Sequence, residues 1–293
     1  MTLVEGRMGA SSFATNAAVV ACVCLLSAVA PAKAQERPDV RADQVRVEYV
    51  TPTNPAHQSV YKLLKENRVL EKLQEVLMPL RLPAPLVLRT DGCDGESNAW
   101  YEDQRVTVCY EYIEELIRNA PQGTTRRGIS RQDAIIGPTI EVFLHEAGHA
   151  VFDILRLPIL GREEDAADQF AAFALLQLGH KETPRIIGGI AYMYAREARQ
   201  QNLELKDFAD VHGVPAQRMF NLLCMAYGAD PTLFADLVDK GDLPRERAET
   251  CGEEYQQVAY AFEKQIAPHM DETLRLTTSA RFKSQQWLKP EQP

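Results

Sequence analysis

The stretch FLHEAGHAVFDIL, residues 143–155, has the apolar pattern of a buried helix but carries three proton-active side chains at its centre. Burial of an unpaired polar side chain costs roughly 1–3 kcal/mol, so a helix that only packs would carry Leu or Ala there. His145 and His149 are four residues apart and therefore lie on one helix face. Glu146 lies about 100° further round the helix axis. This HExxH pattern predicts two imidazole ligands for a metal, commonly zinc, with Glu146 as general base; chance placement of three ordinary side chains is the alternative.

A second amphipathic helix, predicted over residues 163–179, supplies the groups that two histidines lack. A catalytic zinc usually has three protein ligands and one open position. Glu164 and Asp168 begin the buried stripe of this helix, so Glu164 is the expected third ligand. Asp168, one turn later, is expected to accept the N–H of a ligand histidine and to fix its tautomer. We interpret Glu163 and Asp165 as an acidic first turn that favours a helix N-terminus and points away from the metal.

Three stretches of the chain resemble a bacterial family of zinc metallopeptidases catalogued as a domain of unknown function. They are HEAGHAVFDILRLPILGREEDAADQFA (145–171), RMFNLLCMAYG (218–228) and LPRERAETCGEEY (243–255). The resemblance covers roughly residues 45–265. More broadly, HExxH followed by ExxxD is similar to the gluzincin pattern of zinc peptidases, although the segment between the two motifs is shorter than in many gluzincins. The resemblance implies zinc held by His145, His149 and Glu164, with Glu146 as the base.

The first 34 residues have the pattern of a signal peptide. Arg7 precedes the apolar run 17–30, and Ala32–Ala34 follows with the small-x-small pattern of a cleavage site, which predicts cleavage before Gln35. A membrane anchor is the alternative, but the run is shorter than the roughly 20 residues that a spanning helix needs. We therefore expect export to the periplasm or the extracellular space, without a stable membrane anchor.

Removal of the signal peptide leaves four cysteines, an even number that suits an oxidising compartment. Four cysteines allow three pairings, and sequence alone does not select one of them rigorously. Proximity favours Cys93 with Cys109, which would tie two extended segments, and Cys224 with Cys251, which would tie a helix to the loop after it. A cysteine-rich metal site is disfavoured because the chain has no CxxC motif.

The pattern of apolar residues predicts an α+β fold that is mostly helical, with a small N-terminal antiparallel or mixed sheet in the zincin-like order. Short strands are predicted within residues 85–110. The predicted helices cover 58–79, 112–119, 138–156, 163–179, 184–199, 215–228, 231–239 and 252–267. Pro138 is expected in the first turn of the metal-binding helix. AWYED, residues 99–103, is a candidate for the edge strand that pairs with an extended substrate, although an ordinary hairpin strand is an equal alternative.

The predicted organisation is a single metallopeptidase-like domain between polar ends. Its segments are a signal peptide at 1–34, a polar lead-in at 35–57, the domain at 58–270 and a polar tail at 271–293. Without the signal peptide the chain carries 30 basic and 40 acidic residues, because Arg7, Lys33 and Glu5 are removed. Phosphate binding needs a basic surface, so a nucleic acid is not an expected partner. Nothing in the sequence specifies an oligomeric state.

Several polar residues outside the motif are weighed as additional site residues. Arg126, Arg127 and Arg131 are interpreted as a solvated loop, with substrate carboxylate binding as the alternative. His57, His180, His212 and His269 are expected at surface or cap positions. One further group is expected to stabilise the oxyanion of a tetrahedral intermediate. The candidates are His180, His212, Tyr192, Tyr194 and Tyr227.

The predicted reaction is zinc-assisted hydrolysis of a peptide bond in a peptide or protein substrate. Glu146 would take a proton from water and pass it to the leaving amine. A secreted metal-binding or interaction domain without turnover is the alternative. Glu146 favours the enzyme, because a structural zinc site has no use for a base and usually fills all four positions with Cys and His.

Overall fold

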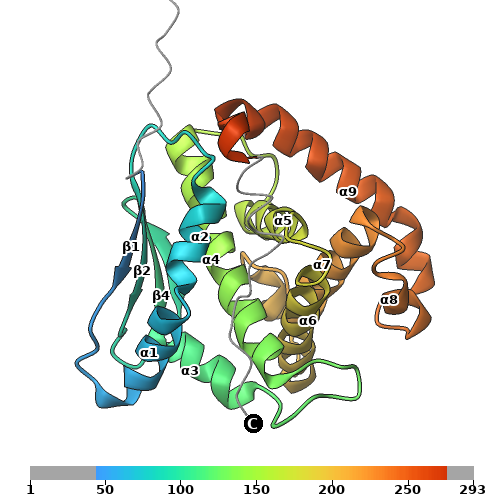
Figure 1. Cartoon of the computed structure of the whole chain (residues 1–293). Coiled ribbons are helices and arrows are strands. Elements are labelled where there is room, and N and C mark those ends of the chain that lie inside the picture. Colours follow the sequence, from blue (N-terminus) through green and yellow to red (C-terminus); the bar gives the residue numbers. More distant parts are fainter. Residues whose placement is uncertain (1–43, 276–293) are drawn as a thin grey trace, which may run out of the picture. The chain divides into compact units, whose positions relative to one another are not determined.

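The structure is a computed structural model, in which we describe residues 44–275 (Figure 1). The predicted signal peptide and its cleavage site before Gln35 lie outside the described residues. So do the first part of the predicted lead-in and most of the predicted polar tail. Within the described part, no helix combines the length and the apolar character that crossing a membrane requires.

A four-stranded mixed sheet with the strand order β1-β2-β4-β3 forms one layer of the fold. The strands are β1 (Val45–Tyr49), β2 (Leu86–Asp91), β3 (Ala99–Glu102) and β4 (Arg105–Cys109). β1, β2 and β4 are parallel, and β3 is antiparallel to β4 at the edge of the sheet. The mostly helical α+β fold with a small mixed sheet is thereby confirmed. β1 is not predicted from the sequence, because its alternating residues lie within the segment interpreted as a polar lead-in.

Helices make up most of the remaining described chain. They are α1 (Gln58–Glu66), α2 (Val69–Leu77), α3 (Tyr110–Asn119), α4 (Arg131–Leu155), α5 (Glu163–Leu176), α6 (Thr183–Gln200), α7 (Pro215–Ala229), α8 (Ala235–Asp239) and α9 (Arg245–Gln265). The prediction of a single helix at 58–79 is wrong. The helix is interrupted at Arg68, which adopts a left-handed backbone conformation with φ 51°. The apolar spacing continues across this break, so periodicity alone does not reveal it.

The helix that carries the HExxH motif, α4, begins two turns earlier than predicted. Ser130 caps it by accepting the N–H of Asp133, while the Asp133 carboxylate accepts the N–H of Ser130 at 3.1 Å. Pro138 therefore lies inside the helix and not in its first turn, so that prediction is wrong. The reciprocal cap satisfies the first free N–H groups of the helix and sets its start upstream of the proline.

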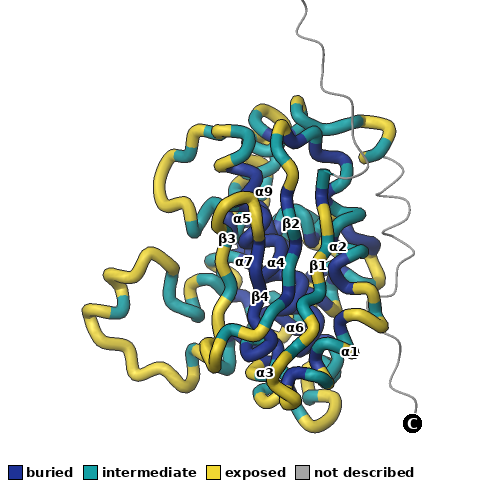
Figure 2. The backbone as a smooth tube through the Cα atoms, turned by 90° about the vertical axis from the view of Figure 1, so that its left-hand side faces the viewer, coloured by how far each residue is buried: buried dark blue, intermediate teal, exposed yellow. Residues whose placement is uncertain are grey.

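α4 lies between the sheet and helices α5 and α6, while α2 packs on the sheet beside it, as Figure 1 shows. Alternate residues of β2 turn inward, and Leu86 and Leu88 are buried on the face toward α4. No helix among residues 44–275 covers the opposite face of the sheet, and Figure 2 shows buried α4 behind the strands. α6 approaches α4 closely at Gly189, where an added Cβ would lie 1.9 Å from the carbonyl oxygen of Asp133. The long motif helix is thus fixed on both sides by packing.

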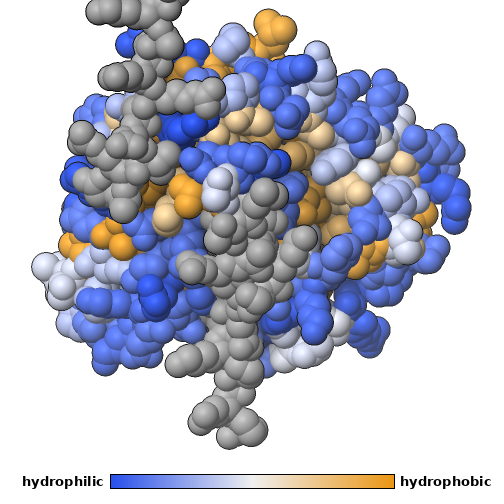
Figure 3. All heavy atoms as spheres, turned by 45° about the horizontal axis from the view of Figure 1, so that its top comes forward, coloured by the Kyte–Doolittle hydropathy of each residue, from blue (hydrophilic) through white to orange (hydrophobic). Residues whose placement is uncertain are grey.

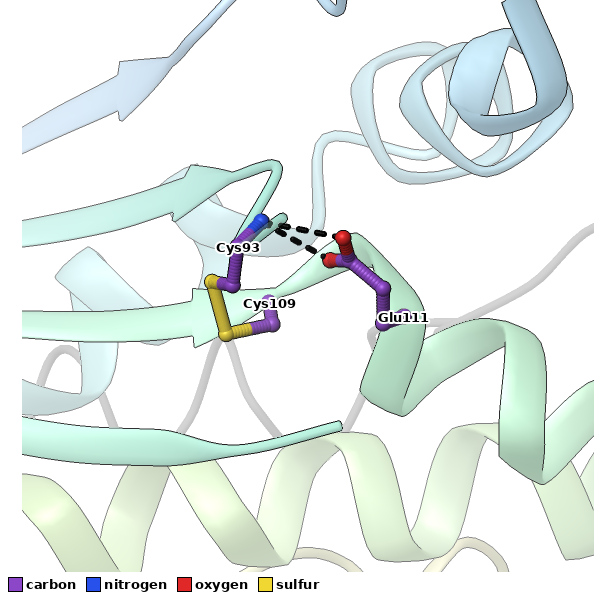
Figure 4. Close-up of side chains that lie close together, drawn as sticks. All are labelled: Cys93, Cys109 and Glu111. Carbon is purple, nitrogen blue, oxygen red and sulfur yellow. Dashed lines mark hydrogen bonds between the residues drawn. A yellow bond between two sulfur atoms is a disulfide. The ribbon is translucent and has the colours of Figure 1, made fainter. Parts of the chain in front are cut away.

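Two disulfides join segments of this fold, and Cys109, Cys224 and Cys251 are fully buried. Cys93 pairs with Cys109, and Figure 4 shows the Glu111 carboxylate accepting the N–H of Cys93 beside this bridge, at 3.0 Å to each oxygen. Cys224 pairs with Cys251. Both pairings are those that proximity along the chain favours. The second bridge joins helices α7 and α9, whereas the sequence suggested a helix and a loop, because α9 begins before Cys251.

The exposed surface of the described residues is largely hydrophilic. On the face presented in Figure 3, blue hydrophilic residues predominate, and hydrophobic residues occupy smaller areas between them. This agrees with the acidic composition of the chain, which has a net charge of −9. Among residues 44–275, few large hydrophobic side chains are exposed.

Candidate metal centre

His145 and His149 project from the same face of α4 and meet the Glu164 carboxylate of α5. The two Nε2 atoms lie 3.3 Å apart. Glu164 Oε2 is 3.1 Å from Nε2 of His145 and 3.3 Å from Nε2 of His149. The predicted ligand residues are therefore brought together, with one atom of each forming a nearly equilateral triangle.

The dimensions of this triangle fit a tetrahedral metal site. Ligand atoms at the usual zinc distances of about 2.0–2.1 Å are about 3.3 Å apart in a tetrahedron. The three residues form one of the few groups of His, Cys, Asp or Glu among residues 44–275 that are close enough to share an ion. Another such group contains Cys93 and Cys109, but their sulfurs are already joined to each other.

The close approach of α4 and α5 that forms the triangle depends on Gly148, inside the HEAGH motif. A Cβ added at Gly148 would lie 3.2 Å from the Cα of Ala167 and 3.3 Å from the ring of Phe170. Those distances are tighter than most van der Waals contacts, so a larger residue would push α5 away. The small residue in the motif thus lets Glu164 reach the histidines.

A carboxylate oxygen lies within hydrogen-bond distance of the Nδ1 atom of each histidine. His145 Nδ1 lies 2.8 Å from Asp168 Oδ1, the pairing expected from the sequence. His149 Nδ1 lies 2.8 Å from Glu163 Oε1. With both Nδ1 atoms as donors, each Nε2 presents a lone pair toward Glu164, and only a cation or a proton can occupy the space between three acceptors.

The role of Glu163 differs from the sequence interpretation, which directed it away from the site. Helical periodicity gives the direction of a Cα–Cβ bond, but the longer glutamate side chain reaches across to the facing helix. Its side chain is about half exposed, while that of His149 is largely covered. Glu163 therefore contacts the site from its solvent side.

A buried polar network lies beneath His145. Arg218 of α7 donates from Nε to Asp168 Oδ2 at 2.8 Å and from an Nη atom to Oδ1 at 2.6 Å. It also lies 3.5 Å from Glu141, which accepts a hydrogen bond of 2.8 Å from the hydroxyl of Tyr194. Neither Arg218 nor Glu141 is predicted from the sequence. The sequence feature that could have revealed these two residues is a charged side chain within an otherwise apolar helical stretch.

The pKa values of Glu164 and Glu146 are shifted in opposite directions. The hydrogen bond with His145 and the electrostatic effect of the nearby rings of His149 and His212 outweigh partial burial and lower the pKa of Glu164 to about 2. Burial raises the pKa of Glu146, and the charges of the two motif histidines only partly oppose this. Glu146 is buried beside the triangle and forms no hydrogen bond with another described side chain. A raised pKa and a free carboxylate suit a group that exchanges protons.

Burial lowers the pKa of His145, but its hydrogen bonds to Asp168 and Glu164 and the nearby negative charges raise it to about 10. The negative charges that surround this ring belong to Asp168, Glu164 and Glu141. Positive charge is favoured at this point of the molecule. The same arrangement would stabilise a bound metal ion.

Among the oxyanion candidates, His212 alone contacts the triangle. Its Nε2 lies 2.8 Å from Glu164 Oε2, on the link between α6 and α7. The side chain of His180 is 78 % exposed and lies near Asp230. Tyr194 is buried against Glu141, Tyr192 packs beside the first turns of α4, and Tyr227 packs on the main core.

The remaining predicted positions have structural roles. His57 is buried but occupies a cap position as expected, as the N-cap residue of α1, with Nδ1 2.8 Å from Glu114 Oε1. Arg131 donates to the carbonyl oxygens that end α3, so it is not a solvated loop residue. Arg127 pairs with Asp242 at 3.1 Å. None of these three residues contacts the histidine–glutamate triangle.

The candidate edge strand β3 runs beside the motif helix. The hydroxyl of Tyr101 donates to Asp153 Oδ2 at 2.7 Å, and Asp153 follows His149 by one turn of α4. β3 is also the hairpin partner of β4. Within residues 44–275, β3 is therefore a hairpin strand whose outer edge pairs with no other strand, and it packs against the motif helix α4.

Comparison with known proteins gives one match. A family model, DUF4344, described as "Putative metallopeptidase", matches residues 49–265. No curated protein and no solved structure matches the chain significantly. The matched range includes every residue of the triangle and of the network beneath it.

Proposed function

Because the chain belongs to the metallopeptidase family whose model spans residues 49–265, we propose that it is a zinc-dependent peptidase that hydrolyses peptide or protein substrates. The observation that carries the proposal is the triangle of three ligand atoms separated by 3.1–3.3 Å. His145, His149 and Glu164 would hold the ion, with Asp168 and Glu163 orienting the two rings. When bound, zinc supplies Lewis-acid chemistry: it lowers the pKa of water to about 7 and polarises the carbonyl of the substrate.

Glu146 is the proposed general base. Its carboxylate is buried and has no hydrogen-bond partner among the described side chains, so it is free to accept a proton from the attacking water. The pKa raised by burial lets the same carboxyl group hold this proton and then deliver it to the leaving amine. A site that only binds metal would not need this carboxyl group.

His212 is the proposed stabiliser of the oxyanion that develops as water attacks. It lies beside Glu164 without belonging to the ligand triangle, and its side chain is about half exposed. A ring N–H directed at the developing negative charge would lower the barrier most in a site that excludes water. The edge of β3 would bind the extended substrate through its free backbone groups.

Export to the periplasm or the extracellular space is also proposed. The two cysteine pairs support it, because disulfides persist in oxidising compartments and are rare in the cytosol. The predicted signal peptide would direct this export. The acidic net charge of −9 is consistent with a peptide substrate and disfavours nucleic acid as a partner.

The test of the proposed function is Glu146→Gln in the full chain, assayed for zinc content and for cleavage of a mixed peptide library by mass spectrometry. The amide cannot accept a proton at neutral pH, so hydrolysis should fall by about 10²-fold or more. Zinc content should stay at about one per chain, because Glu146 is not a proposed ligand. Glu249→Gln, an exposed change on α9, is the matched control and should leave both measurements unchanged.

Two results would contradict the proposal. Loss of zinc in Glu146→Gln would make this residue a ligand. Wild-type protein that binds zinc but cleaves nothing in the library would favour the alternative, a metal-binding domain without turnover.

A further inference from the structure

Exposed hydrophobic side chains are concentrated on one short segment of the described chain. Seven large hydrophobic residues are well exposed among residues 44–275, and four of them lie within residues 203–211 of the link between α6 and α7. These four are Leu203, Leu205, Phe208 and Val211. Single exposed hydrophobic residues are common, but a group of them usually marks an interaction site. We call residues 203–211 the apolar loop.

The apolar loop has a local structure that presents its hydrophobic side chains together. Residues Leu205–Ala209 form the 3₁₀ helix η2, which is capped by Glu204 and Asp207 in a reciprocal pair. Side chains three residues apart eclipse each other in a 3₁₀ helix. Leu205 and Phe208, with exposures of 88 % and 59 %, therefore project from the same side.

The apolar loop is joined directly to the candidate metal centre. Val211 precedes His212, whose Nε2 lies 2.8 Å from Glu164 Oε2. Consecutive Cα atoms are only 3.8 Å apart, so the end of the loop lies at the triangle. The link between α4 and α5, which connects the two ligand-bearing helices, carries another fully exposed hydrophobic residue, Leu160.

We infer that the apolar loop is the substrate-recognition surface of the proposed peptidase and that it selects peptide segments with large apolar side chains next to the scissile bond. This inference rests on the proposed function. Such segments are buried in folded proteins, so the substrates are unfolded chains or peptides and not folded domains. Leu205 and Phe208 bind the apolar side chains of the substrate, and His212 directly follows the loop at the candidate metal centre.

The charges of the apolar loop favour a peptide over a membrane as its partner. Glu204, Asp207 and Asp210 outnumber the single basic residue of the segment, Lys206. Anionic lipid surfaces attract basic segments and repel acidic ones. A peptide carries no fixed negative surface and can place apolar side chains on the loop.

The test uses the zinc-loaded Glu146→Gln protein, so that peptide affinity is measured without cleavage. The probes are two fluorescent peptides, one with Phe and Leu at its central positions and one with Ser in their places. The apolar peptide should bind at least tenfold more tightly, and Leu205→Ser or Phe208→Ser should each weaken it about tenfold. Phe208→Leu should retain the affinity, and Tyr260→Ser, an equally exposed change on α9, should leave it unchanged.

Equal affinity for the two peptides, or unchanged affinity in both serine variants, would overturn the inference. Binding to phosphatidylcholine–phosphatidylglycerol vesicles that depended on Phe208, without an effect on peptides, would assign the loop to membranes instead. Cleavage by the wild-type protein separates the two proposals. Phe208-dependent peptide binding without any cleavage would reject only the peptidase, whereas cleavage of both peptides at equal rates would reject only the recognition surface.

Discussion

Arg218 donates to both oxygens of the Asp168 carboxylate, with its Nε 2.8 Å from Oδ2 and an Nη atom 2.6 Å from Oδ1, the oxygen that also lies 2.8 Å from His145 Nδ1. One carboxylate thus links an arginine of α7 to the buried histidine of α4. Burial raises the pKa of Asp168, but the hydrogen bonds from His145 and Arg218 more than offset this and lower it. The arginine keeps Asp168 ionised and fixed in direction, which in turn fixes the tautomer of His145.

Removal of Arg218 should strongly destabilise the fold. Arg218→Ala leaves Asp168 and Glu141 buried without their positive partner, and such uncompensated charge costs about 3–5 kcal/mol. Chemical denaturation should therefore show a large loss in the free energy of unfolding. Arg247→Ala, which removes a more exposed ion pair with Glu254, is the control and should cost about 1 kcal/mol or less. Equal losses in the two variants would show that the network does not behave as a buried one.

The two motif histidines should be essential for metal binding. His145→Ala or His149→Ala should remove the zinc found in the purified protein, measured by atomic emission. Glu164→Ala should weaken zinc binding strongly, whereas Asp168→Ala should reduce affinity or activity by about 10- to 100-fold. Full zinc retention by both histidine variants would refute the ligand assignment. A larger effect of Asp168 than of Glu164 would reverse their roles.

Loss of His212 should impair turnover without removing the metal. His212→Ala should lower kcat by about 10²- to 10³-fold on any library peptide that the wild type cleaves, because an oxyanion donor acts in the transition state. KM and zinc content should change little. His180→Ala, at an exposed position beside Asp230, should behave as wild type. Loss of zinc from His212→Ala would instead make this residue a ligand.

The mature protein should contain no free thiols. Titration under denaturing conditions should detect none, and peptide mapping should link Cys93 to Cys109 and Cys224 to Cys251. Loops of 16 and 27 residues predict that each bridge stabilises the protein by about 3 kcal/mol through restriction of the unfolded chain. Cys224→Ser/Cys251→Ser should show that loss in thermal denaturation. Four reactive thiols in the purified protein would count against both the bridges and export.

The sequence by itself determined the local parts of the candidate site. His145 and His149 share a helix face because they are four residues apart, and Glu164 and Asp168 share a face of the next helix for the same reason. These relations depend only on the repeat of the α-helix. The even number of cysteines and the mostly helical α+β pattern are likewise visible without the structure.

Only the tertiary structure decided which distant groups complete the site. Asp168 and Arg218 are separated by 50 residues, and their contact depends on how α5 packs against α7. The same holds for Glu163 at His149 and for His212 at Glu164, since side-chain reach and loop path are set by the packed neighbours. Helical periodicity repeats within one element and can therefore be recognised in the sequence. The way in which helices cross depends on packing across the whole core. Gly148 is an example, because the absence of a Cβ there allows α4 and α5 to approach each other closely.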